Sequence, residues 1–343
     1  MYRKIMGFLE AWKENEHRKP LILQGARQVG KTYSILEFGR IHYENVAYFN
    51  FETNPKLNET FEEKISPDYL IPILSHIAGQ TIVKEKTLIV FDEVQLCERA
   101  LTSLKYFCED APDYHIIVAG SLLGVAVNRA KFSFPVGKVD MKTLYPMDME
   151  EFMLAMGEEQ LVELIKKCFE TNRPMPSALH DAAMQLYRQY LVVGGMPECV
   201  MQFVQTGDYI LIRHTQDTIL TSYLNDMGKY NNLNEIKKTR LAYDNITVQL
   251  SKKNTRFQYK LIKKGGRASE FENAIEWLCL SGIVSQVYRV EQIKKPLENY
   301  RDIDAFKIYV SDLGLLCAKK DLAANDILYM VEELNDFKGG MTE

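Results

Sequence analysis

The sequence predicts an α/β protein with a parallel five-stranded sheet. The prediction rests on the alternation of strand-like and helix-like segments in the first 150 residues. Five short apolar or β-branched runs are separated by segments long enough for helices. The runs cover residues 20–25, 46–52, 87–93, 114–121 and 139–146. Their brevity, and the glycine or charge at their ends, favour strands over buried helix segments. Alternation of strands and helices implies parallel strands with crossover helices on both faces of the sheet.

The composition predicts a soluble intracellular protein. Apolar residues make up 46% of the 343 residues, charged residues make up 26%, and the net charge of −4 excludes a polybasic protein. Six scattered cysteines without a C-x-x-C pair, and a charged N-terminus, favour reduced thiols in the cytoplasm. The most apolar run, 116–127, is shorter than the ~20 residues that a membrane span needs. We therefore expect a cytoplasmic protein that does not span a membrane.

The segment "GARQVGKT", residues 25–32, has the form G-x-x-x-x-G-K-T. It follows a predicted strand and opens a predicted helix, a geometry that directs backbone N–H groups at an anion. Lys31 is expected to reach the β- and γ-phosphates of ATP, and the Thr32 hydroxyl to bind Mg²⁺. The alternative is a glycine-rich turn with an exposed lysine. The predicted ATP-binding residues are Gly25, Ala26, Arg27, Gln28, Val29, Gly30, Lys31, Thr32 and Tyr33.

A second motif, "TLIVFDE", places Asp92 and Glu93 at the end of an apolar strand. We expect Asp92 to hold Mg²⁺ together with Thr32, and Glu93 to activate the attacking water as general base. The extra run 46–52 between the two motifs indicates that the strand with Asp92 is not adjacent to the strand before the phosphate loop. This arrangement is typical of the additional-strand division of P-loop ATPases.

Ser121 ends the next predicted strand. Two roles are open for Ser121: it senses the γ-phosphate, or it caps the helix that follows. One role does not exclude the other. The predicted catalytic residues are therefore Lys31, Glu93 and Ser121.

The chain resembles a prokaryotic group of AAA-type ATPases that carry a C-terminal region of unknown function, related to archaeal-type and signal-transducing ATPases. The resemblance rests on "GARQVGKT", "FDEVQ", "VAGSLLG", "FPVGKVDMKTLYPMDMEEF", "GGMPECV" and "FKIYVSDLGLL", which together span residues 20–317. It implies a Rossmann-like P-loop NTPase core, a helical lid and a winged-helix-like domain. It also implies that Pro197, beside Gly195, packs against the adenine. The alternative for Pro197 is an ordinary helix start.

The sequence departs from this family in two places. Many relatives carry Gly-Arg where this chain has Gly137–Lys138. If that arginine binds phosphate, Lys138 would keep its positive charge but not its bidentate geometry. Many relatives also continue with a segment similar to restriction endonucleases, and this sequence stops about where that segment would begin. We therefore expect residues 321–343 to be the start of a truncated segment, and we carry over no nuclease activity.

The second half of the sequence is predominantly helical up to residue 235, which fits a lid and connecting helices. A basic stretch, 237–267, then holds ten Lys or Arg and a single acid. A predicted helix and two strand-like runs, 284–290 and 306–312, come after it, as in a helix–turn–helix with a two-stranded wing. The predicted domains are 1–150 for the ATPase core, 151–235 for the lid and 236–320 for the winged-helix-like domain.

The basic stretch predicts contact with DNA phosphates, although a solvated face or a surface for an acidic protein partner fits as well. No residue identifies itself as base-reading. The predicted DNA-contacting residues are Lys252, Lys253, Arg256, Lys260, Lys263, Lys264 and Arg267.

These patterns together predict a Mg²⁺-dependent ATPase that acts as a nucleotide switch coupled to the winged-helix-like domain. The alternatives are a nucleotide-gated DNA-binding module with little turnover, and an interaction protein that has lost catalysis. The intact Lys31, Asp92 and Glu93 argue against lost catalysis. No arginine finger is evident, which favours slow hydrolysis stimulated by a protein client or by a second copy of the chain.

Overall fold

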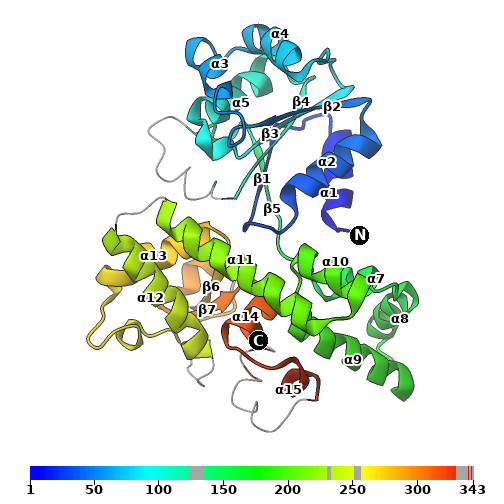
Figure 1. The fold of residues 1–343 in the computed structure, drawn as a ribbon, viewed down its shortest axis with the longest axis vertical. Helices are drawn as coiled ribbons and strands as arrows, with labels where there is room; N and C mark the ends of the chain where they lie inside the picture. The colour runs from blue at the N-terminus through cyan, green and yellow to red at the C-terminus, as the bar shows by residue number, and fades with distance from the viewer. Residues whose placement is uncertain are drawn as a thin grey trace. The chain divides into compact units, whose positions relative to one another are not determined.

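The computed structural model describes residues 1–121, 123, 134–229, 233–250, 256–329, 339 and 341. The chain divides into two compact units (Figure 1). The N-terminal unit is Arg3–Tyr145, and the C-terminal unit comprises Met1–Tyr2 and Pro146–Glu343. Among the described residues, no helix is both long enough and apolar enough to cross a membrane.

The N-terminal unit is built on a five-stranded, fully parallel sheet with the order β2-β3-β4-β1-β5. The five predicted strands are confirmed. β4 lies between β1 and β3, so the strand that carries Asp92 is not adjacent to the strand before the phosphate loop, as expected. The extra strand β2 lies at the edge, beyond β3. The strands are β1 Leu21–Gln24, β2 Asn45–Asn50, β3 Thr87–Asp92, β4 His115–Gly120 and β5 Asp140–Thr143.

Helices cover both faces of this sheet (Figure 1). On one face, strand residues such as Ile22 and Phe91 belong to a buried apolar cluster with side chains of α3, α4 and α5. On the other face, α2 lies so close that a Cβ at Gly39 would be 2.5 Å from Val46 Cγ2 and 3.1 Å from Leu88 Cδ2. The helices are α1 Ile5–Glu14, α2 Lys31–His42, α3 Leu57–Glu63, α4 Pro67–Ala78 and α5 Glu98–Asp110, with a short 3₁₀ helix, η1, at Val94–Leu96.

The C-terminal unit begins with helices whose apolar faces pack on one another. α7 starts with a capping box between Asp148 and Glu151. Residues of α9 pack on one side against α7 and α8, and on the other against α14 and α15. The helices are α7 Met149–Ala155, α8 Glu159–Glu170, α9 Ser177–Val193, α10 Pro197–Thr206, α11 Tyr209–Lys229, α12 Leu233–Leu250, α13 Ala268–Leu280, α14 Leu313–Lys319 and α15 Ala324–Leu328.

An antiparallel hairpin, β6 Val284–Val290 and β7 Arg301–Val310, comes after α13. A short 3₁₀ helix, η2 Tyr259–Leu261, precedes α13, and another, η3 Leu297–Tyr300, lies between β6 and β7. The backbone N–H of Phe257 donates to the Phe306 carbonyl at 2.7 Å, which ties the segment before η2 to β7. The strand pair predicted for the second half is thus present, and β7 begins five residues earlier than its apolar run indicates.

Candidate functional site

The loop between β1 and α2 has a backbone that only certain residues allow. Gly25 has φ +148°, and a Cβ there would lie 2.1 Å from the Leu144 carbonyl oxygen beside it. Gly30 has φ +90° and is the N-cap of α2. Both glycines are therefore required by the turn itself. Gln28 also has a positive φ, 66°, which is costly for a residue with a Cβ.

A buried arginine outside the motif holds this loop. Arg3 is 4% exposed, and its Nη1 donates to the Val29 carbonyl at 2.9 Å. Its Nη2 donates to the Tyr145 carbonyl, just after β5, at 2.8 Å. Arg3 was not predicted from the sequence, because an arginine in a charged N-terminal segment carries no motif.

The Lys31 side chain lies inside the loop. It is 7% exposed, and Nζ donates to the carbonyls of Gly25 at 2.9 Å and Ala26 at 2.8 Å. Burial lowers the pKa of Lys31 to about 8, although the carboxylates of Glu93 and Asp92 oppose that shift. The ammonium group therefore lies among loop carbonyls, and the alternative of an exposed lysine on a turn is wrong.

The two predicted magnesium ligands are in contact. Thr32 Oγ1 donates to Asp92 Oδ2 at 2.9 Å. The hydroxyl of Tyr48, on β2, donates to the same oxygen at 2.7 Å. Burial, followed by the bond to Asp92, raises the pKa of Tyr48 to about 12, against the opposing hydrogen bond from Asn50. Tyr48 was not predicted from the sequence, because only the pairing of β2 with β3 brings it to Asp92.

Glu93 lies directly after β3 with φ 51°. Its Oε2 accepts hydrogen bonds from Gln95 Nε2 and, at 3.4 Å, from Ser121 Oγ. Ser121 comes directly after β4, so the parallel neighbours β3 and β4 bring the predicted base and the predicted sensor together. The helix that Ser121 was expected to cap falls in residues 122 and 124–133, outside the described residues.

Gln95 is a further polar side chain at this carboxylate. It ends the segment "FDEVQ" that carries the family resemblance, but no role was predicted for it. Its Oε1 is buried without a hydrogen-bond partner among the described residues. A Cβ at Gly120 would lie 2.1 Å from this oxygen, so the absence of a side chain at Gly120 leaves room for the Gln95 amide.

The residues present fit a magnesium–nucleotide complex. Hydroxyl and carboxylate oxygens are the ligands that Mg²⁺ prefers, and Thr32 and Asp92 bring one of each together. The N-terminus of α2 and the Lys31 ammonium add positive potential for phosphates. Ala26 and Val29 are buried, so they have backbone groups but no side-chain surface to offer a ligand, whereas Tyr33 is 61% exposed.

Comparison with known families agrees with this geometry. Residues 17–153 match the family described as AAA domain. The N-terminal unit is an AAA domain. Residues 184–326 match a second family, described as a domain of unknown function, DUF8612. The chain thus joins an AAA domain to a C-terminal domain of unknown function, as the sequence resemblance implied. No curated protein matches the chain.

A solved structure of another protein shares this fold, and a second one resembles it more weakly. The Walker-type ATPase PABY2304 of Pyrococcus abyssi matches with a TM-score of 0.56 at 14% identity, over 93% of this chain and 95% of that one. The Aeropyrum pernix ORC2 protein, solved in ADPNP–ADP complexes, matches with a TM-score of 0.42 at 11% identity, over 100% of this chain and 96% of that one. The first match shows a shared fold, and the second is too weak to carry an argument.

Gly195 and Pro197 of the segment "GGMP" lie in the C-terminal unit, where α9 connects to α10. A Cβ at Gly195 would lie 1.9 Å from the Met147 carbonyl oxygen, and the Gly195 N–H donates to Asp312 Oδ2 at 2.6 Å. Pro197 is the first residue of α10. These contacts explain both residues as parts of a helix connection, and the predicted adenine contact stays a prediction.

Lys138 lies away from the phosphate loop. It precedes β5, whereas the loop leaves the opposite, carboxyl end of β1, the strand parallel to β5. Its Nζ pairs with Glu109 at 2.9 Å. The idea that Lys138 replaces a phosphate-binding arginine is therefore wrong for this structure.

The predicted DNA-contacting residues have different surroundings. Lys252 and Lys253 lie outside the described residues. Lys263 Nζ pairs with Glu270 at 3.2 Å. Arg256, Lys260, Lys264 and Arg267 are exposed.

Proposed function

We propose that this chain binds ATP with Mg²⁺ and hydrolyses it, acting as a nucleotide switch. The observation that carries the proposal is the convergence of four groups at the carboxyl edge of the sheet. Thr32 and Asp92 are joined by a hydrogen bond at 2.9 Å, Glu93 comes directly after Asp92, and Lys31 lies buried within the loop. The AAA domain family supports nucleotide binding and hydrolysis.

Each group has a defined task in this proposal. The loop N–H groups and Lys31 bind the phosphates, and Thr32 and Asp92 hold the metal ion. The bound Mg²⁺ would neutralise phosphate charge and orient the β- and γ-phosphates. Glu93 accepts the proton of the attacking water, and Ser121 and Gln95 hold the Glu93 carboxylate in position.

The response to the nucleotide is assigned to the C-terminal unit. In this proposal residues 151–235 form a lid, with Pro197 against the adenine, and residues 236–320 form a winged-helix-like domain. The order α12, η2, α13, β6, β7 supports the second assignment. The six free cysteines support a cytoplasmic location.

ATP hydrolysis by the full chain, measured with and without duplex DNA, tests the proposal. Glu93→Gln should keep ATP binding and lower the hydrolysis rate by roughly 10²–10⁴-fold, because general-base catalysis contributes about that much. Lys31→Ala should lose ATP affinity. A wild-type chain that binds no ATP would contradict the whole assignment, and undiminished hydrolysis by Glu93→Gln would contradict the role of Glu93.

A DNA-binding module gated by the nucleotide, with little turnover, is the second candidate. The exposed Arg256, Lys260 and Arg267 favour it. Salt-dependent DNA affinity that changes with ATP would support it, and strong hydrolysis without DNA would count against it. The absence of an evident arginine finger in the sequence favours slow hydrolysis stimulated by a partner or a second copy.

A further inference from the structure

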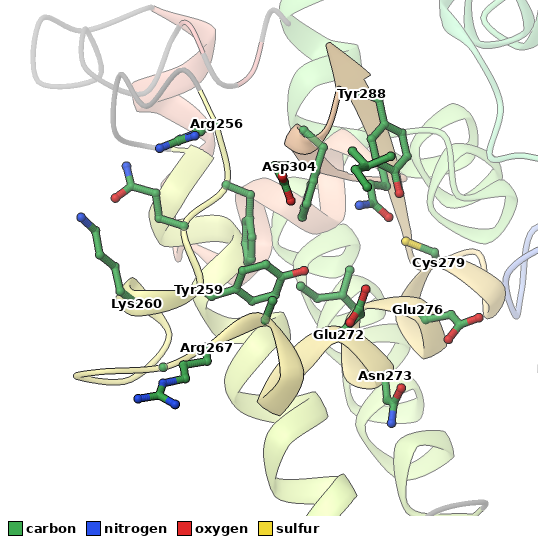
Figure 2. A pocket seen from close by; sticks show the side chains of 18 of the residues that line it. Arg256, Tyr259, Lys260, Arg267, Glu272, Asn273, Glu276, Cys279, Tyr288 and Asp304 are labelled. Carbon is green, nitrogen blue, oxygen red and sulfur yellow. The ribbon is translucent and has the colours of Figure 1, made fainter. Parts of the chain in front are cut away.

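A large groove opens between α13 and the β6–β7 hairpin in the C-terminal unit. Its volume is about 980 Å³, and residues 256–260 close one end of it (Figure 2). Along α13 the lining runs from Ala268 to Leu280. Twelve residue steps of ~1.5 Å make this wall about 18 Å long. An extended peptide rises about 3.3 Å per residue, so the groove has room for five or six residues.

Aromatic rings form part of the wall. The Phe306 ring centroid lies 5.6 Å from that of Tyr288 and 6.1 Å from that of Tyr259. The guanidinium of Arg301 lies 3.6 Å from the centroid of the Tyr288 ring. The molecule therefore already contains one guanidinium stacked on a ring of this groove, the geometry by which aromatic faces bind cations.

Three carboxylates line the same groove, and none has an ion pair in the part of the chain that the structure describes. Glu272 and Glu276 lie one turn apart on α13, and Asp304 lies on β7. By contrast Glu270, on the same helix but not in the lining, pairs with Lys263. Four basic side chains also line the groove, Arg256, Lys260, Arg267 and Arg301, so the formal charge of the whole lining is 4 − 3 = +1.

The negative charge of two of these carboxylates affects the pKa of the Tyr259 hydroxyl. Burial, followed by the negative charge of Glu272 and, further down, of Asp304, raises the pKa of Tyr259 to about 12. In Figure 2 the labelled Lys260 and Arg267 lie on the other side of Tyr259 from Glu272 and Glu276. The charges of the lining are thus segregated, with an acidic side at Glu272 and Glu276 and a basic side at Lys260 and Arg267.

We propose that this groove is the docking site for an extended segment of a protein partner that presents arginine or lysine side chains. On the acidic side of the groove, a guanidinium or ammonium group would stack on the ring of Tyr259 and pair with Glu272 and Glu276. The apolar Ile303, which is 68% exposed on β7, gives a neighbouring residue an apolar contact. Calling this partner the client of the switch rests on the proposed function, but the docking itself requires neither ATP nor hydrolysis.

The same observations disfavour nucleic acid at this place. α13 is the helix that a DNA-binding winged helix would insert into the major groove. It carries Glu270, Glu272 and Glu276 and no Lys or Arg. Three carboxylates on that helix would repel the phosphates on both sides of the groove.

Fluorescence anisotropy with the full, nucleotide-free chain tests the proposal. The probes are fluorescein-labelled octapeptide pools with Arg or Lys fixed at two central positions, matched pools with Gln there, and a 20-nucleotide duplex. We expect the Arg and Lys pools to bind at least tenfold more tightly than the Gln pools. The variant Glu272→Gln/Glu276→Gln should lose at least tenfold in affinity for them. Glu270→Gln, the matched control on the same helix, should stay within twofold of wild type.

Each other outcome overturns the proposal. Equal binding of Gln and Arg pools would remove the charge argument, and unchanged affinity in Glu272→Gln/Glu276→Gln would place the peptide elsewhere. Displacement of the peptide by the duplex would assign the groove to nucleic acid. Thermal unfolding of each variant checks that it is folded. ATP hydrolysis measured in parallel separates this result from the proposed function, since either can fail alone.

Discussion

At the scale of single residues, the predicted site contains its expected chemistry and three side chains for which no role was predicted. Arg3, Tyr48 and Gln95 each contact a predicted functional group: a loop carbonyl, the Asp92 carboxylate and the Glu93 carboxylate. The sequence pattern contains the groups that are expected to do the chemistry. Of the groups that hold them, Tyr48 comes from β2 and Arg3 from the N-terminal segment, so their positions depend on tertiary pairing, whereas Gln95 lies in η1 directly after the Asp92–Glu93 pair.

Gln95 gives the first prediction. Gln95→Glu would set two carboxylates against each other, which raises the pKa of the pair because both resist ionisation together. We expect about a tenfold loss in hydrolysis rate at pH 7 and an acidic limb of the pH–rate profile that moves to higher pH. ATP affinity should stay within twofold. An unmoved acidic limb would show that Gln95 does not act on Glu93.

Gly120 supplies an independent check of the same contact. A Cβ in Gly120→Ala would displace the Gln95 amide and should therefore lower the rate about as much as Gln95→Ala does. The double variant should be no slower than either single one. Additive losses would contradict a shared mechanism.

Gln28 gives the second prediction. With a φ of 66°, a residue that has a Cβ is roughly 1–2 kcal/mol less stable than glycine in the folded chain. Glycine also raises the conformational entropy of the unfolded chain, which offsets part of this gain. Gln28→Gly should therefore raise the free energy of unfolding by about 0.5–1 kcal/mol, measured by urea titration. Gln80→Gly, at a residue without a positive φ, is the control and should not stabilise the protein.

At the scale of elements, two sequence motifs from opposite ends of the C-terminal unit meet. The turn of Gly194–Gly195 after α9 packs on the start of α14, where a Cβ at Gly194 would lie 2.4 Å from Asp312 Oδ1. Asp312 caps α14 by accepting from the Leu315 N–H at 2.8 Å. This close approach leaves no room for a side chain at Gly194, and the Met147 carbonyl leaves none at Gly195.

Asp312 makes this contact pH-dependent and gives the third prediction. Burial raises the pKa of Asp312 to about 6, against three backbone N–H donors that lower it. Since an unfolded aspartate titrates near ~3.9, the folded chain binds the proton more tightly between about pH 4 and pH 6. The stability that this group contributes is therefore complete below about pH 4 and is lost as the pH rises through 6.

Urea unfolding of wild type and Asp312→Asn between pH 5 and pH 7.5 measures the effect. The free energy of unfolding of wild type minus that of the variant should fall as the pH rises. Asp181→Asn, which removes an exposed carboxylate from α9, controls for the loss of one charge. A difference that rises with pH would contradict the assigned direction.

At the scale of the whole molecule, the chain consists of two compact units, and the N-terminal unit has its own core. Apolar residues of the parallel strands and of α3, α4 and α5 form one buried cluster within it. The last strand, β5, pairs with β1 and brings Leu144 against Gly25. A chain that ends before β5 would leave one edge of β1 and the phosphate loop without this support.

The fourth prediction concerns this arrangement. A chain of residues 1–145 should fold alone and unfold in one cooperative thermal transition, measured by circular dichroism. The matched control, residues 1–138, lacks β5 and should unfold without cooperativity. Absence of a cooperative transition in 1–145 would show that the N-terminal unit depends on the rest of the chain.

The sequence by itself determined the parallel strands, the phosphate loop and the Asp92–Glu93 pair, because local patterns of apolar runs, glycines and carboxylates encode them. Tertiary structure alone decided that Tyr48 reaches Asp92, that Arg3 holds the loop, that Lys138 lies at the other end of the sheet and that Gly195 contacts Asp312. The physical reason is that these contacts join residues from 26 to 142 positions apart. Such contacts depend on the order of strands and the packing of helices, which no short segment specifies.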